Sequence, residues 1–239
     1  MVAFSLIIPA FNEAALLPRL LESIRVARGR FTRGEIEVIV ADNASTDETA
    51  RIARESGCIV VDVVERKIAC ARNGGAARAR SGILGFVDAD SVLHPETFNS
   101  IHEAMSGPGI VGGATGVRFD RSSPGIDLTV ALVRPMVHLM GLDGGVVFCF
   151  ARDFRDLGGY PESERIAEDV NFLLKLKRLG KTRGQRFRIL EGVTTITSSR
   201  KFDQHGDWHF LLTVPKIIAA RLFSRRGFDE HVNNYWYRR

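Results

Sequence analysis

The stretch IEVIVADNASTDETA, residues 36–50, sets the pattern that decides the fold. Its apolar run ends in Asp42, and a polar loop then leads into a helical segment. The same order recurs on both sides of it. Apolar runs predict strands at 4–9, 36–41, 58–64 and 83–89, and helical spacing predicts helices at 12–28, 46–56 and 68–80. Strands that alternate with helices at this spacing indicate βαβ units and a parallel sheet covered on both faces.

Beyond residue 90 the alternation becomes irregular. We expect helices at 95–105, 125–142, 151–157, 167–179 and 207–225, and strands at 109–119, 144–150, 186–190 and 193–197. The sequence contains no repeats, low-complexity tracts or obvious linkers. We therefore predict an α/β fold with a single domain over 1–239, divided into a regular half (1–92), a mixed half that completes the sheet (93–205), and a basic helix and tail (206–239).

The composition excludes several classes of protein. Of the 239 residues, 45% are hydrophobic and 26% are charged, which is typical of a globular protein. The three cysteines form no CxxC pair, so a disulfide framework and a zinc finger are excluded and a reducing compartment is favoured. The most apolar stretch, 126–150, is interrupted by charged residues, and the first residues lack a basic leader. These features predict a cytoplasmic protein.

Charge is distributed unevenly along the chain. Residues 1–174 carry 18 Lys+Arg and 23 Asp+Glu, whereas residues 175–239 carry 15 and 5. A basic final third favours an anionic partner, which is nucleic acid, a phosphorylated ligand or an anionic membrane; a solvated basic face is the alternative. The segment 208–226 joins an apolar face to basic residues. It predicts either a helix packed on the core or peripheral contact with the inner face of the membrane.

Carboxylates gather where the predicted strands end. Ligands of an open α/β sheet bind outside the carboxyl ends of its strands. Asp42, Glu65 and the pair Asp88 and Asp90 follow three of the four N-terminal strands directly. Such carboxylates would repel one another, and a bound cation or a ligand rich in donors would relieve that cost.

Asp88 and Asp90 are the most informative pair. With a period of two, both carboxylates leave the strand on the same side, where hard oxygen ligands suit Mg²⁺ or Mn²⁺. A turn or a helix N-cap is the alternative. Asp42, at the tip of its strand, can accept a hydrogen bond from a base N–H or a ribose hydroxyl. Residues 45–47 are interpreted as the cap and first turn of the next helix.

Other candidates each have a structural and a functional interpretation. Gly74 and Gly75 within a helix cost about 1 kcal/mol each relative to alanine, which indicates either close approach of a ligand or close helix packing. Arg72 beside them is either a phosphate contact or a surface arginine. The pair Glu168 and Asp169 is either a source of a general base or a favourable partner of the helix dipole.

The remaining candidates are glycines and a histidine. Gly144 and Gly145 indicate a turn, or a place where substrate approaches the backbone. His205 is either a structural histidine or a ligand. GxGxxG, HExxH and GxSxG motifs are absent, and the GKT at 180–182 lacks the first glycine of a P-loop.

Several longer motifs follow one another along the chain. They are IIPAFNE (7–13), VIVADNASTDET (38–49), ARNGGAARARSGILGFVDADS (71–91), GGVVFCFARDFRDLGGYPE (144–162) and AEDVNFLLKLKRLGK (167–181). Each is modest alone, but in this order and spacing they are highly specific. Over about residues 4–205 the chain resembles the family 2 glycosyltransferases. The resemblance implies the GT-A fold, with a Rossmann-like, mostly parallel sheet whose first half binds a nucleotide-sugar.

The resemblance also implies a role for each matching residue. The donor site would be formed by Pro9, Ala10, Asn12, Glu13, Asp42, Arg72, Asn73 and Asp88. Asp42 would bind the base, Arg72 and Asn73 would lie near the base and diphosphate, and Asp88 would face the ribose. Asp90 would hold the metal together with Asp88, and His205 resembles a histidine that helps to hold it in some members. Asp169 would be the catalytic base, and the acceptor side would contain Gly144, Gly145, Glu168 and Arg200.

The implied reaction is an inverting single displacement that moves one sugar to a hydroxyl of a glycan or lipid-linked acceptor, as in polysaccharide biosynthesis. A divalent metal, Mn or Mg, would stabilise the departing nucleoside diphosphate. The QxxRW signature is absent, so we expect single transfer without polymer synthesis. A nucleotide-sugar donor and a glycan or lipid-linked acceptor are the expected partners, and no nucleic-acid partner is expected. One alternative is a non-catalytic nucleotide-sugar binder or scaffold. Another is a sugar nucleotidyltransferase, which would need a glycine-rich loop where PAFNE stands.

Overall fold

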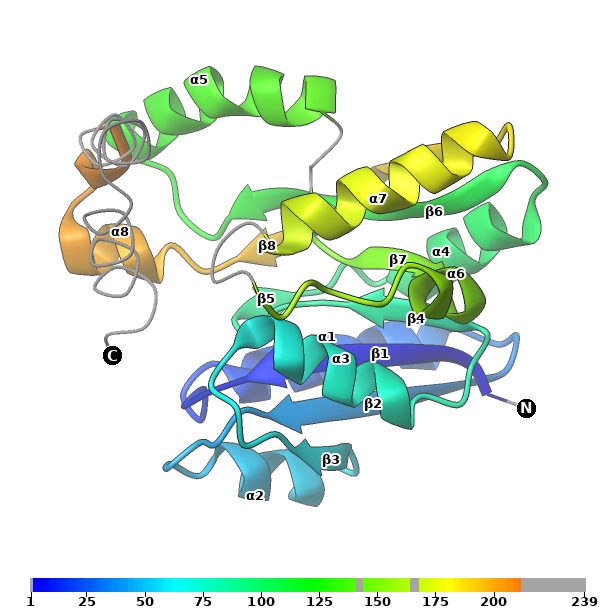
Figure 1. The fold of residues 1–239 in the computed structure, drawn as a ribbon. Coiled ribbons are helices and arrows are strands. Elements are labelled where there is room, and N and C mark those ends of the chain that lie inside the picture. Colours follow the sequence, from blue (N-terminus) through cyan, green and yellow to red (C-terminus); the bar gives the residue numbers. More distant parts are fainter. Residues whose placement is uncertain (1, 141–143, 164–167, 212–239) are drawn as a thin grey trace. The chain divides into compact units, whose positions relative to one another are not determined.

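The chain forms a mixed eight-stranded sheet with helices on both faces (Figure 1). This computed structural model describes residues 2–140, 144–163 and 168–211. It divides into two compact units, the first containing 1–118 and 141–197 and the second 119–140 and 198–239. The predicted α/β class is confirmed.

The sheet belongs to the first unit and has the order β3-β2-β1-β4-β7-β6-β8-β5. Its parallel part contains β1 (Val2–Ala10), β2 (Glu35–Asp42), β3 (Ile59–Asp62) and β4 (Ile83–Phe86). Antiparallel pairing joins β4 to β7, β7 to β6 and β8 to β5. These strands are β5 (Ser91–Val92), β6 (Ile110–Phe119), β7 (Val147–Phe150) and β8 (Arg186–Thr197). A regular parallel half and a mixed half are therefore present, as the sequence predicts.

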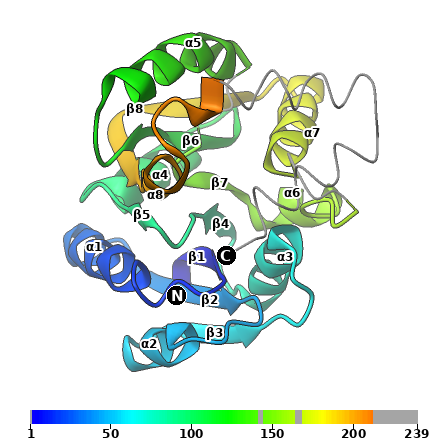
Figure 2. The same ribbon diagram turned by 90° about the vertical axis from the view of Figure 1, so that its left-hand side faces the viewer.

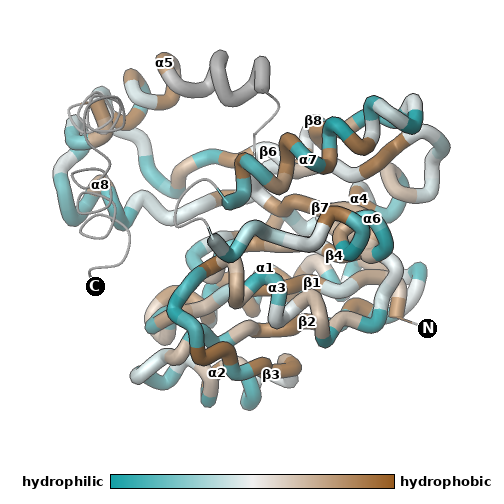
Figure 3. The backbone as a smooth tube through the Cα atoms, in the orientation of Figure 1, coloured by the Kyte–Doolittle hydropathy of each residue, from teal (hydrophilic) through white to brown (hydrophobic). Residues whose placement is uncertain are grey.

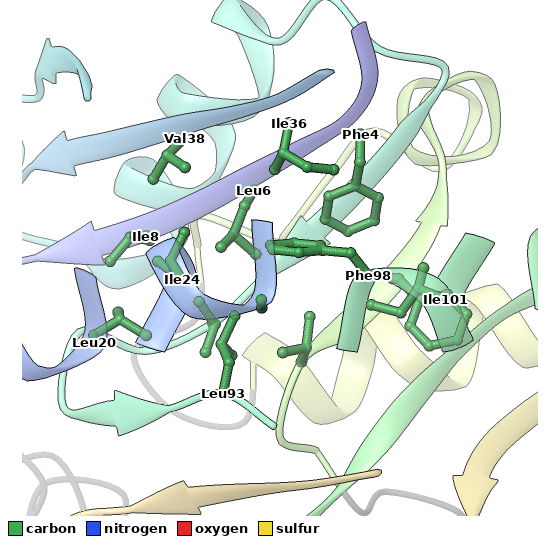
Figure 4. Packing of buried hydrophobic residues seen from close by; sticks show 14 of the residues in the cluster. Phe4, Leu6, Ile8, Leu20, Ile24, Ile36, Val38, Leu93, Phe98 and Ile101 are labelled. Carbon is green, nitrogen blue, oxygen red and sulfur yellow. The ribbon is translucent and has the colours of Figure 1, made fainter. Parts of the chain in front are cut away.

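Helices cover the two faces of this sheet and form two cores. One face carries α1 (Leu17–Arg30), α2 (Thr49–Glu55) and α4 (Thr97–Ser106); the other carries α3 (Ile68–Arg78), α6 (Ala151–Asp156) and α7 (Glu168–Thr182). Figure 2 shows α1 and α3 on opposite sides of β1 and β2. Both cores use β1, since Leu6 and Ile8 enter the first and Ile7 enters the second. In the first core, the rings of Phe4 and Phe98 meet edge to face at 5.5 Å (Figure 4).

The second core explains two glycines. A Cβ added to Gly75 in α3 would lie 2.5 Å from Cγ2 of Ile7, so Gly75 allows close packing of the helix on β1. The helix predicted at 167–179 is expected to stop at Gly180, but the observed helix, α7, continues to Thr182. A Cβ on Gly180 would lie 2.8 Å from Cγ1 of Val111, so this glycine also serves packing. Hydrophobic and hydrophilic residues alternate along α7, as expected for a helix with one buried face (Figure 3).

Several predicted strands differ from those observed. The two short strands expected at 186–190 and 193–197 are one strand, β8. Gly192 interrupts the apolar pattern, but it continues the strand with a φ of 79°, which glycine adopts without strain. The strand expected at 83–89 ends at Phe86, because the chain turns at Asp88, whose carbonyl accepts a hydrogen bond from the Ser91 N–H at 3.2 Å.

The second unit contains α5 (Pro124–Met140) and α8 (Arg200–His205). Arg121 holds it together through ion pairs with Asp203 at 2.7 Å and Asp207 at 2.6 Å. The sequence pattern missed α8. Of the helix expected at 207–225, residues 209–211 are helical, and residues from 212 onward lie outside the described part. Among the helices of the described residues, none combines the length and apolar character that crossing a membrane requires.

Candidate active site

The candidate site lies at the carboxyl edge of the parallel strands. Ala10, the last residue of β1, pairs with Asp42, the last residue of β2. The carbonyl of Ala10 also accepts a hydrogen bond from the Asn43 N–H at 2.7 Å. The predicted edge is therefore formed, and Pro9, Ala10 and Asp42 lie together on it.

The loops that follow β1 and β2 hold each other. Asn12 N–H donates to Ser45 Oγ at 3.0 Å, and Thr46 N–H donates to Asn12 Oδ1 at 2.8 Å. Buried Glu13 donates its N–H to Thr49 Oγ1 at 2.8 Å. Asn12 and Ala44 have φ values of 53° and 60°, a conformation that costs most residues about 1–3 kcal/mol. The cross-links between the loops maintain this strained backbone at the edge of the site.

The cap of α2 differs from the prediction for residues 45–47. The helix begins at Thr49, and the Asp47 carboxylate accepts hydrogen bonds from Thr49 N–H at 3.0 Å and Ala14 N–H at 3.1 Å. Ser45 instead faces the β1 loop through Asn12. Burial raises the pKa of Asp47, but these hydrogen bonds outweigh it and lower the pKa overall. Asp47 is therefore an ionised clamp between the two loops at neutral pH.

Two buried oxygen atoms at this edge lack partners. Asp42 and Asn43 are each 7% exposed, and their Oδ1 atoms accept no hydrogen bond in the described part of the chain. A buried acceptor without a donor costs about 1–3 kcal/mol. Both atoms can accept N–H groups, such as those on the edge of a nucleobase. The strand tip is thus prepared for a ligand that donates hydrogen bonds.

Arg72 joins two parts of the site. Placed by α3, it donates from Nη1 to Glu168 Oε1 at 2.9 Å and from Nη2 to Asp88 Oδ1 at 3.0 Å. Its side chain is 9% exposed and lies over the ring of Tyr160, with Cζ 5.0 Å from the ring centroid. The sequence leaves open a surface arginine, and the structure excludes that alternative.

The charges around Arg72 reinforce one another. Burial lowers the pKa of Arg72, but Asp88, Tyr160, Glu168 and Asp169 raise it above its usual value, so the guanidinium stays charged. Burial raises the pKa of Glu168, Arg72 opposes that change, and Asp169 adds to it. Glu168 therefore depends on Arg72 for its charge.

Asp88 and Asp90 lie in the turn between β4 and β5. The period-two argument that predicted their direction does not apply, since β4 has ended before them. The Asp88 side chain is 55% exposed, and Asp90 is half-buried. Two carboxylates on one accessible turn fit a hard divalent cation that keeps several waters and takes phosphate oxygens.

Glu168 and Asp169 open α7 and have different surroundings. Glu168 is buried against Arg72, whereas Asp169 is exposed and accepts a hydrogen bond from Val170 N–H at 2.7 Å. Asp169 also acts electrostatically on Arg72, which places it in the same charged group. The accessible carboxylate of the pair is thus Asp169.

Asn73 and Gly145 have structural contacts. The Asn73 side chain accepts a hydrogen bond from Tyr160 N–H and donates one to Tyr160 O, both at 2.9 Å, and donates to Glu162 at 2.8 Å. It therefore holds the turn that follows α6. A Cβ on Gly145 would lie 2.6 Å from Cβ of Thr195, so this glycine packs on a threonine side chain. Gly144 beside it is exposed.

One group is not evident from the sequence pattern: Glu65, Cys70 and Glu162, whose potential ligand atoms lie within 4.8 Å of one another. The Cys70 thiol donates to Glu65 at 3.3 Å. Burial, with both glutamates, raises the pKa of Cys70 to about 11, so the thiol is protonated at neutral pH. Arg200 and His205 lie in α8 of the second unit.

Comparison with known proteins shows the family to which the chain belongs. Residues 5–204 match the family described as glycosyl transferase family 2. Validoxylamine A glucosyltransferase of Streptomyces hygroscopicus subsp. jinggangensis is 36% identical over 110 residues, which are 44% of this chain and 26% of that protein. The chain thus matches about a quarter of that relative's length.

Solved structures share the fold. The crystal structure of S. aureus TarS 1–349 has a TM-score of 0.66 and 20% identity, and the match covers 98% of this chain and 70% of that one. A mannosyltransferase from Pyrobaculum calidifontis, in complex with GDP-Man and Mn²⁺, has a TM-score of 0.63 and 22% identity over 81% of this chain and 56% of that one. These likenesses confirm the expected GT-A fold.

Proposed function

Because this chain belongs to glycosyl transferase family 2, we propose that it moves one sugar from a nucleotide-diphosphate sugar to a hydroxyl of a glycan or lipid-linked acceptor. The observation that carries the proposal is a pair of buried acceptors, Asp42 Oδ1 and Asn43 Oδ1, which have no hydrogen-bond partner among the described residues. They lie at the edge that also holds the Asp88–Asp90 turn. A ligand with N–H donors at one end and phosphates at the other fits that arrangement.

The donor's base is assigned to the tips of β1 and β2. The base N–H groups would satisfy Asp42, whose buried side chain is little accessible to competing water. Pro9, Ala10, Asn12 and Glu13 form the adjoining wall through the interlocked loops. Asn73 would act on this site indirectly, because its side-chain amide is hydrogen-bonded to the backbone of Tyr160.

The diphosphate is assigned to the neighbourhood of Arg72 and the Asp88–Asp90 turn. Asp88 and Asp90 would hold Mn²⁺ or Mg²⁺, and the mannosyltransferase bound to GDP-Man and Mn²⁺ supports such a cofactor. A divalent cation supplies Lewis-acid stabilisation of the charge on the departing diphosphate. Arg72 adds a permanent positive charge beside it.

The acceptor is assigned to the start of α7. Asp169 is the accessible carboxylate there and would take the proton of the acceptor hydroxyl as that oxygen attacks the sugar. The reaction would then be an inverting single displacement without a protein nucleophile. Glu168 would act through Arg72 as a positioning residue. Gly144 and Gly145 remain proposed for the acceptor side, whereas the expected role of Arg200, a residue of the second unit, stays a prediction.

A donor screen tests this function. UDP-, GDP- and dTDP-sugars are added with and without Mn²⁺, and both the melting temperature and the release of nucleoside diphosphate are measured. We expect one nucleotide class to raise the melting temperature in the presence of Mn²⁺ and to be turned over. Stabilisation without any turnover, with acceptor glycans or lipids present, would favour a non-catalytic binder instead. No stabilisation by any donor would contradict the proposal.

A further inference from the structure

A pocket lies at the edge of the sheet opposite the candidate active site. Ile83, the first residue of β4, pairs with Phe150, whereas the candidate active site follows the last residue of β4. Beside Phe150 is a cavity of about 420 Å³, within the size range of sites for small ligands. Its charged lining residues are Arg80, Arg152 and Arg155, which define the arginine pocket.

The arginine pocket concentrates positive charge. Three guanidinium groups line it, and its lining contains no carboxylate. Like charges in one pocket repel each other, and a bound anion would relieve this repulsion. The residues that line the arginine pocket therefore carry three positive charges and no negative charge.

Contacts with neighbouring residues hold the side chains of Arg80 and Arg152 in place. Arg80 donates from its backbone N–H at 2.6 Å and from Nε at 2.7 Å to the buried carboxylate of Glu37. Within the described residues no hydrogen bond uses its Nη1 or Nη2. Arg152 lies over the ring of Phe150, with Cζ 5.0 Å from the centroid. These contacts order the side chains before any ligand binds, which lowers the entropic cost of binding.

The acids nearby are engaged elsewhere. Asp153 is fully buried and pairs with Arg183 at 2.7 Å, whereas its distance to Nε of Arg152 is 3.6 Å. The exposed side chain of Arg155 makes no ion pair within the described ranges. The positive charge of the arginine pocket is therefore only partly compensated by this chain.

We propose that the arginine pocket binds a phosphate group, as a phosphomonoester or diphosphate, at a site separate from the donor site. A guanidinium presents paired N–H donors that match two phosphate oxygens, and several such groups bind a doubly charged anion more strongly than a carboxylate. The group belongs either to a soluble metabolite or to a lipid headgroup. This assignment does not depend on the proposed transferase activity, because it uses other residues.

The test compares the double variant Arg152→Gln/Arg155→Gln with the wild-type chain. Both arginines are exposed, so their loss leaves the cores intact. The matched control is Arg25→Gln/Arg51→Gln, which removes the same charge from arginines already paired with Glu22 and with Glu48 and Glu55. Pyrophosphate binding is measured by calorimetry in EDTA. Sedimentation is measured with phosphatidylcholine vesicles with and without phosphatidic acid.

We expect the dissociation constant for pyrophosphate to rise by about tenfold in the double variant and to stay unchanged in the control. If the double variant loses sedimentation with phosphatidic acid vesicles but binds pyrophosphate as the wild-type chain does, the phosphate group belongs to a lipid headgroup. Equal binding of both probes by all three proteins would overturn the site, as would binding of neither probe by the wild-type chain. Nucleotide-dependent stabilisation with Mn²⁺ is expected to be the same in all three, which separates this result from the donor screen.

Discussion

Nη1 of Arg72 lies 2.9 Å from Oε1 of Glu168, and each side chain is only 9% exposed. The same guanidinium reaches Asp88 through Nη2 at 3.0 Å. One side chain thus connects the turn that follows β4 with the first residue of α7. Because the proposed metal ligands lie on that turn and the proposed base lies in α7, Arg72 holds the two halves of the proposed reaction in a fixed relation.

Replacing Arg72 with Gln tests this connection. The change leaves Glu168 buried without its cation, so we expect the free energy of unfolding to fall by about 3–5 kcal/mol. Arg72→Lys keeps a charge but cannot make both planar contacts, and it should restore stability only in part. Urea unfolding measures the free energy of unfolding of both variants. Arg25→Gln, from an exposed pair, should change stability little. A loss for Arg72→Gln as small as that of this control would refute the connection.

The adjacent acids of α7 should separate catalysis from positioning. Asp169→Asn removes the proposed base, and we expect kcat to fall by about 10²–10⁴-fold with an unchanged melting temperature. Glu168→Gln retains a hydrogen-bond acceptor for Arg72 and should lower activity less. Steady-state kinetics with circular dichroism compares the two. If Glu168→Gln were the more damaging change to kcat, the roles of the two residues would have to be exchanged.

Asp42 should cost stability in the free protein and contribute affinity with the donor. Because Oδ1 of Asp42 has no partner within the described ranges, Asp42→Ala should leave the free energy of unfolding unchanged or raise it by about 1 kcal/mol. Nucleotide affinity should fall by about tenfold, since a buried hydrogen bond is lost. The control is Asp62→Ala, an exposed aspartate on the neighbouring strand. Unchanged affinity in Asp42→Ala would exclude this residue from the base site.

Two helical glycines should respond to alanine in opposite directions. A Cβ on Gly75 would meet Ile7 at 2.5 Å, so we expect Gly75→Ala to cost about 1–3 kcal/mol of stability. Gly29 in α1 has no neighbouring atom within 4 Å of that position, so Gly29→Ala should gain about 0.5–1 kcal/mol. Thermal and urea unfolding give both values. A gain in both variants would show that α3 can move away from β1.

These glycines also show what the sequence can predict. Apolar periodicity is a local property of the sequence. It predicts most of the strands, their succession along the chain and the polar residues at their ends. The contact between Gly75 and Ile7 depends on how a helix packs on a distant strand, and no local pattern reports that. The same is true of β8, where Gly192 looks like a break in the sequence but continues the strand.

The sequence predicts at which edge of the sheet the candidate site lies, but it does not predict which side chains of that site contact one another. Asp42 and Asp88 were placed at the correct edge by the rule for parallel sheets. The pairing of Arg72 with Glu168 joins residues 96 positions apart, and its partners could not be predicted from spacing. The cap of α2 was assigned to the wrong residues because Ser45, Thr46 and Asp47 are all good capping residues, and only the fold brings Asn12 to two of them.

The buried Glu37 should make stability depend on pH. Its carboxylate accepts hydrogen bonds from Ser5 Oγ and from the backbone and Nε of Arg80. Burial raises the pKa of Glu37, but these hydrogen bonds and the charge of Arg80 lower it overall, below the ordinary value of 4.5. The unfolded chain therefore takes up the proton first as pH falls. The stabilisation is present above the unfolded pKa and is lost as pH falls through the folded pKa.

Glu37→Gln removes this titration while keeping a similar shape. Between about pH 7 and about pH 3, we expect the free energy of unfolding to fall more in the wild-type chain than in the variant. Urea unfolding at a series of pH values measures the difference. Glu55→Gln, an exposed helix glutamate, is the control and should follow the wild-type profile closely. Parallel profiles for wild type and Glu37→Gln would mean that Glu37 binds its proton equally well in the folded and unfolded chain, against the hydrogen bonds that surround it.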